Sequence, residues 1–276
     1  MSSDSARSLR DFTRAAGGGL IVGLPLLFTM EVWFRGTSLP WWQLLLLLAV
    51  AYVVDFGYNV TSGFRRERSY GQVALDSVVT MGLGVMIAFA VLVALGRIDG
   101  DSGIRDAAGR VALEAIPIAF GASVASSQLS GEDGAGGLSA NAYARLFVAA
   151  GGALLFALNV APTDEVVLLA AGLSPLMLIV LVGLTLLLTL GLVFFADFGG
   201  GRLRCGDGLL DHPGTETLAA YAISLAMSLL LLWSFGRTDG AGVAAVAAMT
   251  VVLAVVASVG AAIARLIVGG EREGAG

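Results

Sequence analysis

Acidic side chains that interrupt long apolar runs are the residues most able to do chemistry in this sequence. In the clearest case, Pro162, Thr163, Asp164 and Glu165 follow one another shortly after Asn159. Proline lacks a backbone donor and clashes with the carbonyl group four residues earlier. We therefore expect Pro162 to split a helix and to leave carbonyl oxygens near Asn159 free. Carboxylates beside free carbonyl oxygens offer ligands for a cation, and they can also carry a proton.

The position of this segment in a helix decides what its carboxylates can do. In a split membrane-spanning helix, Thr163 would cap the second half, and Asp164 and Glu165 would lie in its first turn, where the helix dipole favours negative charge. Broken helices of this kind form ion and substrate sites in transporters. The alternative is a water-exposed loop, in which Phe147–Val160 forms a short span and Val166–Gly172 begins the next helix.

Glu31 is the second candidate, because it also lies within an apolar stretch. It can pair with Arg35 four residues later, or it can contribute to a site, and both interpretations stay open. Pro25 precedes Thr29 by four residues and is a second predicted helix break. The predicted ion or substrate pathway contains Glu165, Asp164, Thr163, Glu31, Thr29 and Asn159, with breaks at Pro162 and Pro25.

Five further acidic residues are secondary candidates, namely Asp55, Asp76, Glu114, Asp197 and Glu216. All but Glu114 lie near predicted cytoplasmic ends of spans, where they would form an acidic vestibule that concentrates cations. The plainer alternative is charge balance with neighbouring arginines, and we favour it. Glu114 follows Arg110 by four residues and resembles a helical ion pair.

The residue inventory disfavours other kinds of site. His212 is the only histidine and Cys205 the only cysteine, whereas zinc sites use several such ligands at close spacing. Gly199–Gly201 does not continue into a phosphate loop, and the chain contains no lysine. We expect neither a metal nor a cofactor. The net charge of −5 also argues against nucleic-acid binding, which needs a basic surface.

Long apolar runs must position these residues, and the length of the runs identifies the class of protein. The chain of 276 residues is 57% hydrophobic and 13% charged, with a mean hydropathy of +0.87. Soluble domains carry about 25% charged residues. Several runs approach the roughly 20 residues that cross a bilayer as a helix, and a β-barrel would instead show alternating polarity. The sequence therefore predicts an all-α, polytopic bundle of transmembrane helices.

We predict about eight spans. Arginines are more numerous on one side of the predicted membrane, which places both termini in the cytoplasm. A cytoplasmic tail of residues 1–16 precedes the spans, and a tail of residues 269–276 follows them. The eight spans are Gly17–Arg35, Trp41–Tyr58, Val73–Leu95, Val111–Leu129, Phe147–Leu169, Leu176–Ala196, Leu218–Phe235 and Val243–Val268.

The chain contains an internal repeat that relates residues 17–137 to residues 138–268. Small and apolar residues align by chance in any membrane protein, whereas carboxylates inside apolar spans do not. Each half holds four spans, so both halves should enter the membrane in the same direction and form a parallel repeat. In an ungapped register Ala15–Leu20, Thr29 and Glu31 match Ala149–Leu154, Thr163 and Glu165. Downstream of a small insertion, Asp55, Asp76 and Gly96–Gly100 match Asp197, Glu216 and Gly236–Gly240.

The segment Ala161–Glu165, with Phe156–Val160 before it, resembles a family of prokaryotic integral membrane proteins that is defined as a domain of unknown function. The resemblance covers most of the chain, from the first predicted span to the eighth. It implies a multi-span prokaryotic membrane protein, and it carries over neither an activity nor functional residues.

These patterns favour a cation- or proton-linked transporter or channel in the plasma membrane of a prokaryote, with intramembrane carboxylates along its pathway. The expected partners are membrane lipid and a monovalent or divalent cation or a proton, and a homo-oligomer is compatible with the sequence. One alternative is a non-catalytic scaffold or sensor subunit. An enzyme that modifies lipids is less favoured, because the acidic residues are scattered and a nucleophile with its base is missing.

Overall fold

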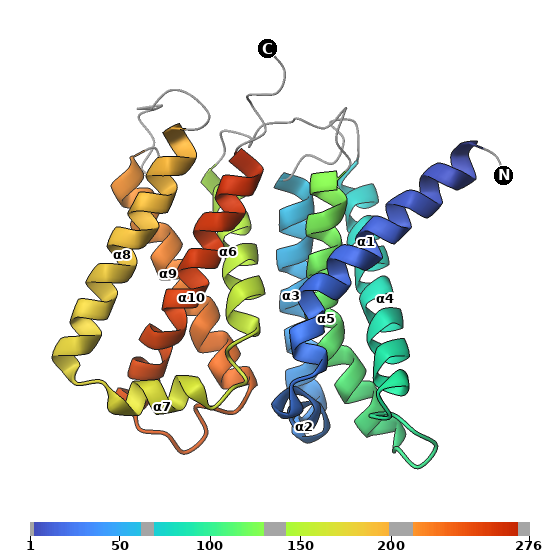
Figure 1. The fold of residues 1–276 in the computed structure, drawn as a ribbon, viewed down its shortest axis with the longest axis horizontal. Coiled ribbons are helices and arrows are strands. Elements are labelled where there is room, and N and C mark those ends of the chain that lie inside the picture. Colours follow the sequence, from blue (N-terminus) through green and yellow to red (C-terminus); the bar gives the residue numbers. More distant parts are fainter. Residues whose placement is uncertain (1–2, 62–68, 130–141, 199–211, 270–276) are drawn as a thin grey trace. The chain divides into compact units, whose positions relative to one another are not determined.

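Every element of the computed structural model is an α-helix over the residues it describes, which are 3–61, 69–129, 142–198 and 212–269. The ten helices are α1 (Ser3–Leu27), α2 (Met30–Ser38), α3 (Trp41–Thr61), α4 (Tyr70–Ala94), α5 (Ile104–Leu129), α6 (Ala142–Leu158), α7 (Glu165–Gly172), α8 (Pro175–Phe198), α9 (Pro213–Ser234) and α10 (Val243–Gly269) (Figure 1). The predicted all-α class is confirmed. Six helices are long and apolar enough to cross a membrane, and α1 with α2 would make a seventh span.

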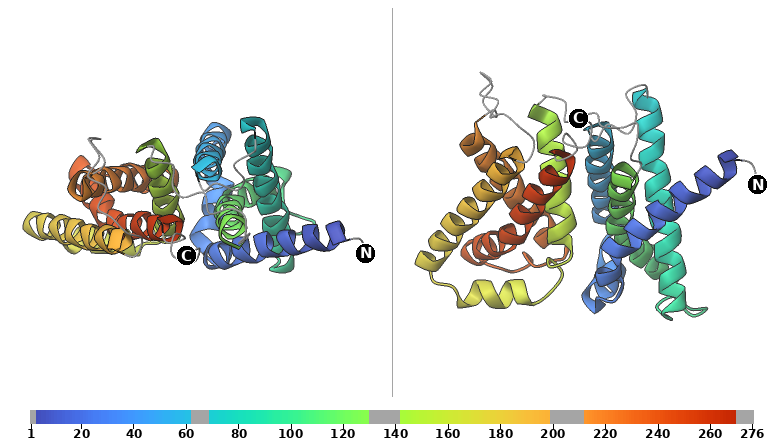
Figure 2. Two further views of the ribbon diagram at one scale, coloured as in Figure 1. Left: turned by 90° about the horizontal axis from the view of Figure 1, so that it is seen from above. Right: turned by 45° about the horizontal axis from the view of Figure 1, so that its top comes forward.

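The chain forms two compact units, Met1–Gly136 and Gly137–Gly276. In the first unit α5 packs against α1, α2, α3 and α4, and in the second unit α10 packs against α6, α7, α8 and α9 (Figures 1 and 2). Inside the apolar part of α5, 72% of the residues are buried, compared with 28% for α4. The corresponding shares are 61% for α10 and 17% for α8. The last long helix is therefore the core of each unit.

Small residues let the first and last long helices of each unit approach closely. Gly18 of α1 faces Gly121 of α5, and Gly152 of α6 faces Gly260 of α10. A Cβ atom at any of the four positions would clash with the facing helix. Membrane helices commonly pack through such residues, because lipid gives little hydrophobic drive for association. The outward faces of α4 and α8 carry large exposed apolar side chains, which suits contact with lipid.

The predicted span Gly17–Arg35 is two helices. α1 ends at Leu27, α2 begins at Met30, and their axes are bent by 85°. Thr29 between them is extended, and its hydroxyl donates to the carbonyl of Pro25 at 2.7 Å. The helix end thus finds a donor for one of its last carbonyl groups. Pro25 lies inside α1, and the break follows it. α1 itself begins at Ser3, so most of the predicted N-terminal tail is helical.

The predicted span Phe147–Leu169 also divides. α6 ends at Leu158, turns carry the chain through Pro162, and the short helix α7 begins at Glu165. In Figure 1 α7 lies across the end of its unit, whereas α6 and α8 run along the unit. The other six predicted spans are continuous helices. Six or seven candidate spans therefore replace the predicted eight, because average hydropathy does not detect a turn between two apolar segments.

The same cap ends α4 and α9. Gly96 and Gly236 follow these helices with φ of 64° and 71°, a conformation that glycine adopts without strain. The N–H groups of Arg97 and Arg237 then donate to carbonyl oxygens in the last turn, each at 2.8 Å, as in a Schellman motif. Both arginines are held at the same place relative to the helix before them.

Candidate functional site

The carboxylates beside Pro162 lie on the surface of the second unit. Glu165 is exposed in the first turn of α7, and Asp164 is the exposed N-cap residue, without a side-chain capping bond. The hydroxyl of Thr163 donates to the carbonyl of Val160 at 2.9 Å. The prediction that Thr163 caps this helix is therefore wrong.

Arg237 holds this segment in place. Its guanidinium donates to Asp164 Oδ1 at 2.6 Å and to the carbonyl of Pro162. The side-chain amide of Asn159 donates back to Leu155 in α6 at 2.9 Å. One oxygen of Asp164 is thus held by an arginine, and the carboxylate is exposed and not enclosed in an ion site. The sequence predicted a cation site of free carbonyl and carboxylate oxygens at this segment. The structure instead contains a turn that Arg237 holds in place.

The charge state of Glu165 is that of a surface group. Hydrogen bonding to Thr163 lowers its pKa below the usual value, so the exposed carboxylate is ionised at neutral pH. In the first unit Glu31 is half-buried in the first turn of α2, and the hydroxyl of Thr29 donates to the carbonyl of Pro25. These residues mark the two helix breaks, one in each unit.

The first unit buries a polar network around Asp55 of α3, which is 1% exposed. Asp55 Oδ2 accepts hydrogen bonds from Thr80 Oγ1 of α4 at 3.0 Å and from Asn59 Nδ2 at 3.3 Å. Asn59 also donates to Ser77 Oγ at 2.9 Å. The hydroxyl of Ser123 on α5 faces the same carboxylate. The hydrogen bonds therefore join α3 and α4, and Ser123 of α5 lies beside them.

Glu114 of α5 is fully buried, and neither of its carboxylate oxygens has a hydrogen-bond partner in the part of the chain that the structure describes. The predicted pair with Arg110 does not form, since Arg110 donates to the carbonyl of Arg97. Burial of an ionised carboxylate without a partner is so costly that the group instead binds a proton or a cation. Glu114 is therefore the strongest candidate for a functional side chain.

Contacts on either side of Glu114 place it at the bend between α1 and α2. Ile118, four residues later on the same helix face, packs against Gly23 of α1. Gly109, five residues earlier, packs against Gly36 of α2. Pro117, inside α5, cannot donate to the carbonyl four residues before it. The buried carboxylate thus lies near two interruptions of regular helix, where carbonyl oxygens lack their usual donors.

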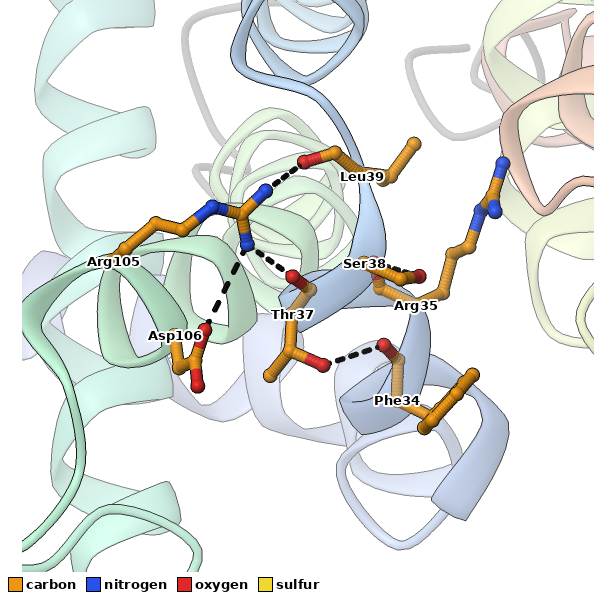
Figure 3. Close-up of polar contacts among 7 residues, drawn as sticks. All are labelled: Phe34, Arg35, Thr37, Ser38, Leu39, Arg105 and Asp106. Atoms are coloured by element: carbon orange, nitrogen blue, oxygen red, sulfur yellow. Dashed lines mark hydrogen bonds and ion pairs between the residues drawn. The ribbon is translucent and has the colours of Figure 1, made fainter.

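Arg105 holds α2 against the start of α5. Figure 3 shows its guanidinium donating to the carbonyl groups of Thr37 and Leu39 at the end of α2. A cation at a helix C-terminus satisfies these groups and is favoured by the dipole. The guanidinium also lies 3.7 Å from Asp106 and 5.6 Å from the ring of Trp41. These contacts hold the C-terminal end of α2 against the first turn of α5.

Asp55 and Glu114 lie at different depths in the first unit. α3 and α5 run in the same direction (Figure 1), and the rings of Tyr58 and Phe120 are 5.8 Å apart. Ser123 of α5, which faces Asp55, follows Glu114 by nine residues. At about 1.5 Å of rise per residue, the two carboxylates are therefore separated by more than about two helical turns along the bundle.

The remaining candidates have other environments. Glu216 of α9 forms a buried ion pair with Arg265 of α10. Asp76 is half-buried on α4, and the side chain of Asp197 lies outside the described residues. Within the described ranges, no group of three or more His, Cys, Asp or Glu side chains could hold a metal ion. Cys205 also lies outside these ranges.

Sequence reasoning placed Glu165 above Glu114 and Asp55, and the structure exposes the first and buries the other two. A signal for Glu114 was present, since it is the only charged residue between positions 111 and 129 and Pro117 follows it by three. A signal for Asp55 was weaker. Asn59 lies one turn later, but Thr80 belongs to another helix.

A comparison with protein families agrees with this membrane architecture. The family model described as "Putative integral membrane protein (DUF2391)" matches residues 11–268. No curated protein and no solved structure matches the chain.

Proposed function

The chain belongs to this family of integral membrane proteins, and from that premise we propose that it moves a cation or a proton across the membrane through its first unit. Glu114 carries the proposal, because its carboxylate is fully buried and lacks a partner among the described residues. An ionisable side chain inside a membrane bundle marks an ion or proton pathway more often than a structural position.

Glu114 would alternate between two states during transport. With a proton or a cation bound, the side chain is neutral or compensated, and without one it carries an isolated charge in a low-dielectric interior. Release therefore requires a second acceptor or water. Asp55 is the other buried carboxylate of the first unit, and Thr80 and Asn59 donate to it. It lies more than about two helical turns from Glu114, so transfer between the two would pass through water. Carboxylate oxygens suit a proton or a hard cation such as Na⁺ or Ca²⁺.

The second unit supports the proposal by contrast. Its buried carboxylate, Glu216, is compensated by Arg265, so it cannot exchange a proton or a cation without breaking an ion pair. We assign it a structural role. In this proposal the first unit contains the pathway.

The two units also suggest a duplicated, parallel arrangement. Each has a long helix, a break, a short helix and three further long helices, of which the last is the core. Thr29 and Thr163 lie in the two breaks, and Glu31 and Glu165 lie in the first turns that follow. With α1 and α2 counted as one pass, the first unit crosses four times, so the second unit would enter from the same side as the first. Cytoplasmic termini and the plasma membrane remain our predictions.

The test is ion movement in proteoliposomes that contain the full chain. Internal pH and the uptake of Na⁺, K⁺ and Ca²⁺ would be followed under imposed gradients. Wild type should move at least one of these ions, and Glu114→Gln should reduce the rate by about tenfold or more, because it cannot exchange a proton or bind a cation as a carboxylate. Asp55→Asn should reduce the rate in the same direction.

Glu165→Gln is the matched control, since it removes a carboxylate that is exposed at the surface. It should transport at the wild-type rate. The proposal fails if wild type moves none of the four ions, or if Glu114→Gln and wild type have the same rate. A wild type that moves no ion would favour the scaffold or sensor function.

A further inference from the structure

A pocket of about 270 Å³ lies at the end of the first unit, between the end of α4 and the start of α5. The buried carboxylates described above do not line it. Aromatic, basic and loop side chains line it, among them Trp33, Arg97, Asp99, Asp101, Ser102 and Arg110.

The two arginines of the pocket are positioned without a carboxylate partner. Arg97 lies 4.9 Å over the ring of Trp33, and the ring is held by a bond from its Nε1 to the carbonyl of Leu27 at 3.0 Å. Arg110 donates to the carbonyl of Arg97, and its Nε is buried without a hydrogen-bond partner. Neither arginine forms an ion pair within the described residues. Two guanidinium groups thus line one pocket, and they have N–H donors beyond those bonded to backbone carbonyl groups.

The acidic residues of the pocket form no ion pair with these arginines among the described residues. Asp99 accepts a hydrogen bond from Ser102 at 2.7 Å, and the N–H of Asp99 donates to the same hydroxyl at 3.1 Å. Hydrogen bonding to Ser102 also lowers the pKa of Asp99, which therefore stays ionised. Asp101 is exposed at the rim. The carboxylate of Asp99 is thus held within its own loop, and Arg97 is exposed beside it.

The second unit shows what such an arginine binds when the chain supplies the anion. Arg237 follows the cap of α9 as Arg97 follows the cap of α4, and its guanidinium binds the carboxylate of Asp164 at 2.6 Å. In the register that matches Thr29 with Thr163, the residue opposite Asp164 is Met30. Methionine supplies no negative charge, so the first unit has the arginine without the anion.

We propose that this pocket binds a phosphate group, carried either by a phospholipid headgroup or by free phosphate. Guanidinium groups bind phosphate oxygens through paired charge-assisted hydrogen bonds. The pocket adjoins the ends of two candidate spans, where lipid headgroups lie.

The experiment measures binding to the purified full chain in detergent. Native mass spectrometry would count retained phosphatidylglycerol, phosphatidylethanolamine and a diacylglycerol with the same acyl chains, and thermal unfolding would be followed with inorganic phosphate. Phosphate-bearing lipids, inorganic phosphate or both should bind, and diacylglycerol should not. Arg97→Gln and Arg110→Gln should each weaken binding by about tenfold, since each removes charge-assisted bonds.

Two further variants separate binding from folding. Arg237→Gln removes the matching arginine of the second unit and should bind like wild type. Met30→Asp, at a position that is 68% exposed, offers Arg97 an internal carboxylate and should weaken binding while both arginines remain. Binding of phospholipid alone or of free phosphate alone identifies the source of the phosphate. Equal binding by wild type, Arg97→Gln and Met30→Asp, or retention of diacylglycerol equal to that of phospholipid, overturns the proposal.

Discussion

Arg237 donates to Asp164 across 2.6 Å, and the two residues are 73 positions apart in the chain. The contact ties the loop after α9 to the turn before α7, and a second bond to the carbonyl of Pro162 strengthens it. This relationship explains the acidic segment between two apolar stretches. One of its carboxylates anchors a short helix at the end of the unit.

Arg237→Gln should loosen α7 without unfolding the protein. Asp164 is 70% exposed, so the ion pair contributes about 1 kcal/mol or less to the free energy of unfolding. Hydrogen exchange should become faster in residues 165–172 and stay unchanged in α1 to α5. Asp164→Asn is the matched variant and should have the smaller effect, because it keeps the bond to Pro162. Unchanged exchange in α7 would contradict the anchoring role.

Glu216→Gln should destabilise the second unit strongly. The pair with Arg265 is buried, and removal of one partner leaves a buried charge, which costs about 3–5 kcal/mol. Unfolding in a graded detergent mixture would measure the loss. The double variant Glu216→Leu with Arg265→Leu should recover much of the stability, because no charge is left buried. A double variant less stable than Glu216→Gln would disagree with this reason.

Gly121→Ala should weaken the packing of α1 on α5. The added methyl group would meet Val22 and the carbonyl of Gly18, and overpacking of this kind costs about 1–3 kcal/mol. Gly17→Ala is the control, since nothing lies near a Cβ atom there and alanine is the better helix former by about 1 kcal/mol. The two variants should change the unfolding midpoint in opposite directions. The same direction for both would contradict the close contact.

Thr163→Val should raise the pKa of Glu165 toward its ordinary value of 4.5, because hydrogen bonding to Thr163 is the main cause of its lowering. The folded-state pKa lies below that of the unfolded chain. Ionised Glu165 therefore favours the folded state above pH 4.5, and this contribution disappears as the pH falls through the lowered pKa. Carboxyl NMR titration of the two proteins would measure the shift. Arg237→Gln should move the pKa less, and the reverse order would contradict the assignment.

Glu114→Leu should increase the stability of the first unit while it abolishes transport. A buried polar group without a partner costs about 1–3 kcal/mol, and leucine of similar size removes that cost. The free energy of unfolding in detergent would be compared with that of wild type. A large loss of stability would indicate that Glu114 has a structural partner after all.

The distribution of hydropathy was sufficient to predict the class and most of the spans. α3, α4, α5, α8, α9 and α10 each coincide with a predicted span, because insertion of a long apolar helix into lipid depends mainly on its own residues. The breaks were harder to predict. Pro25 lies inside α1, and the bend occurs at Thr29, where a side-chain hydroxyl satisfies the helix end.

By itself, then, the sequence determined an all-helical membrane protein of the matched family, with acidic residues in apolar surroundings. Only the tertiary structure decided which of those residues are enclosed. Glu165 is adjacent to an apolar run and is exposed, whereas Glu114 is buried because α1 and α2 approach α5 through glycines. Burial and pairing depend on side chains contributed by other helices. Arg265 of α10, for example, pairs with Glu216 of α9. Local patterns carry no information about those neighbours.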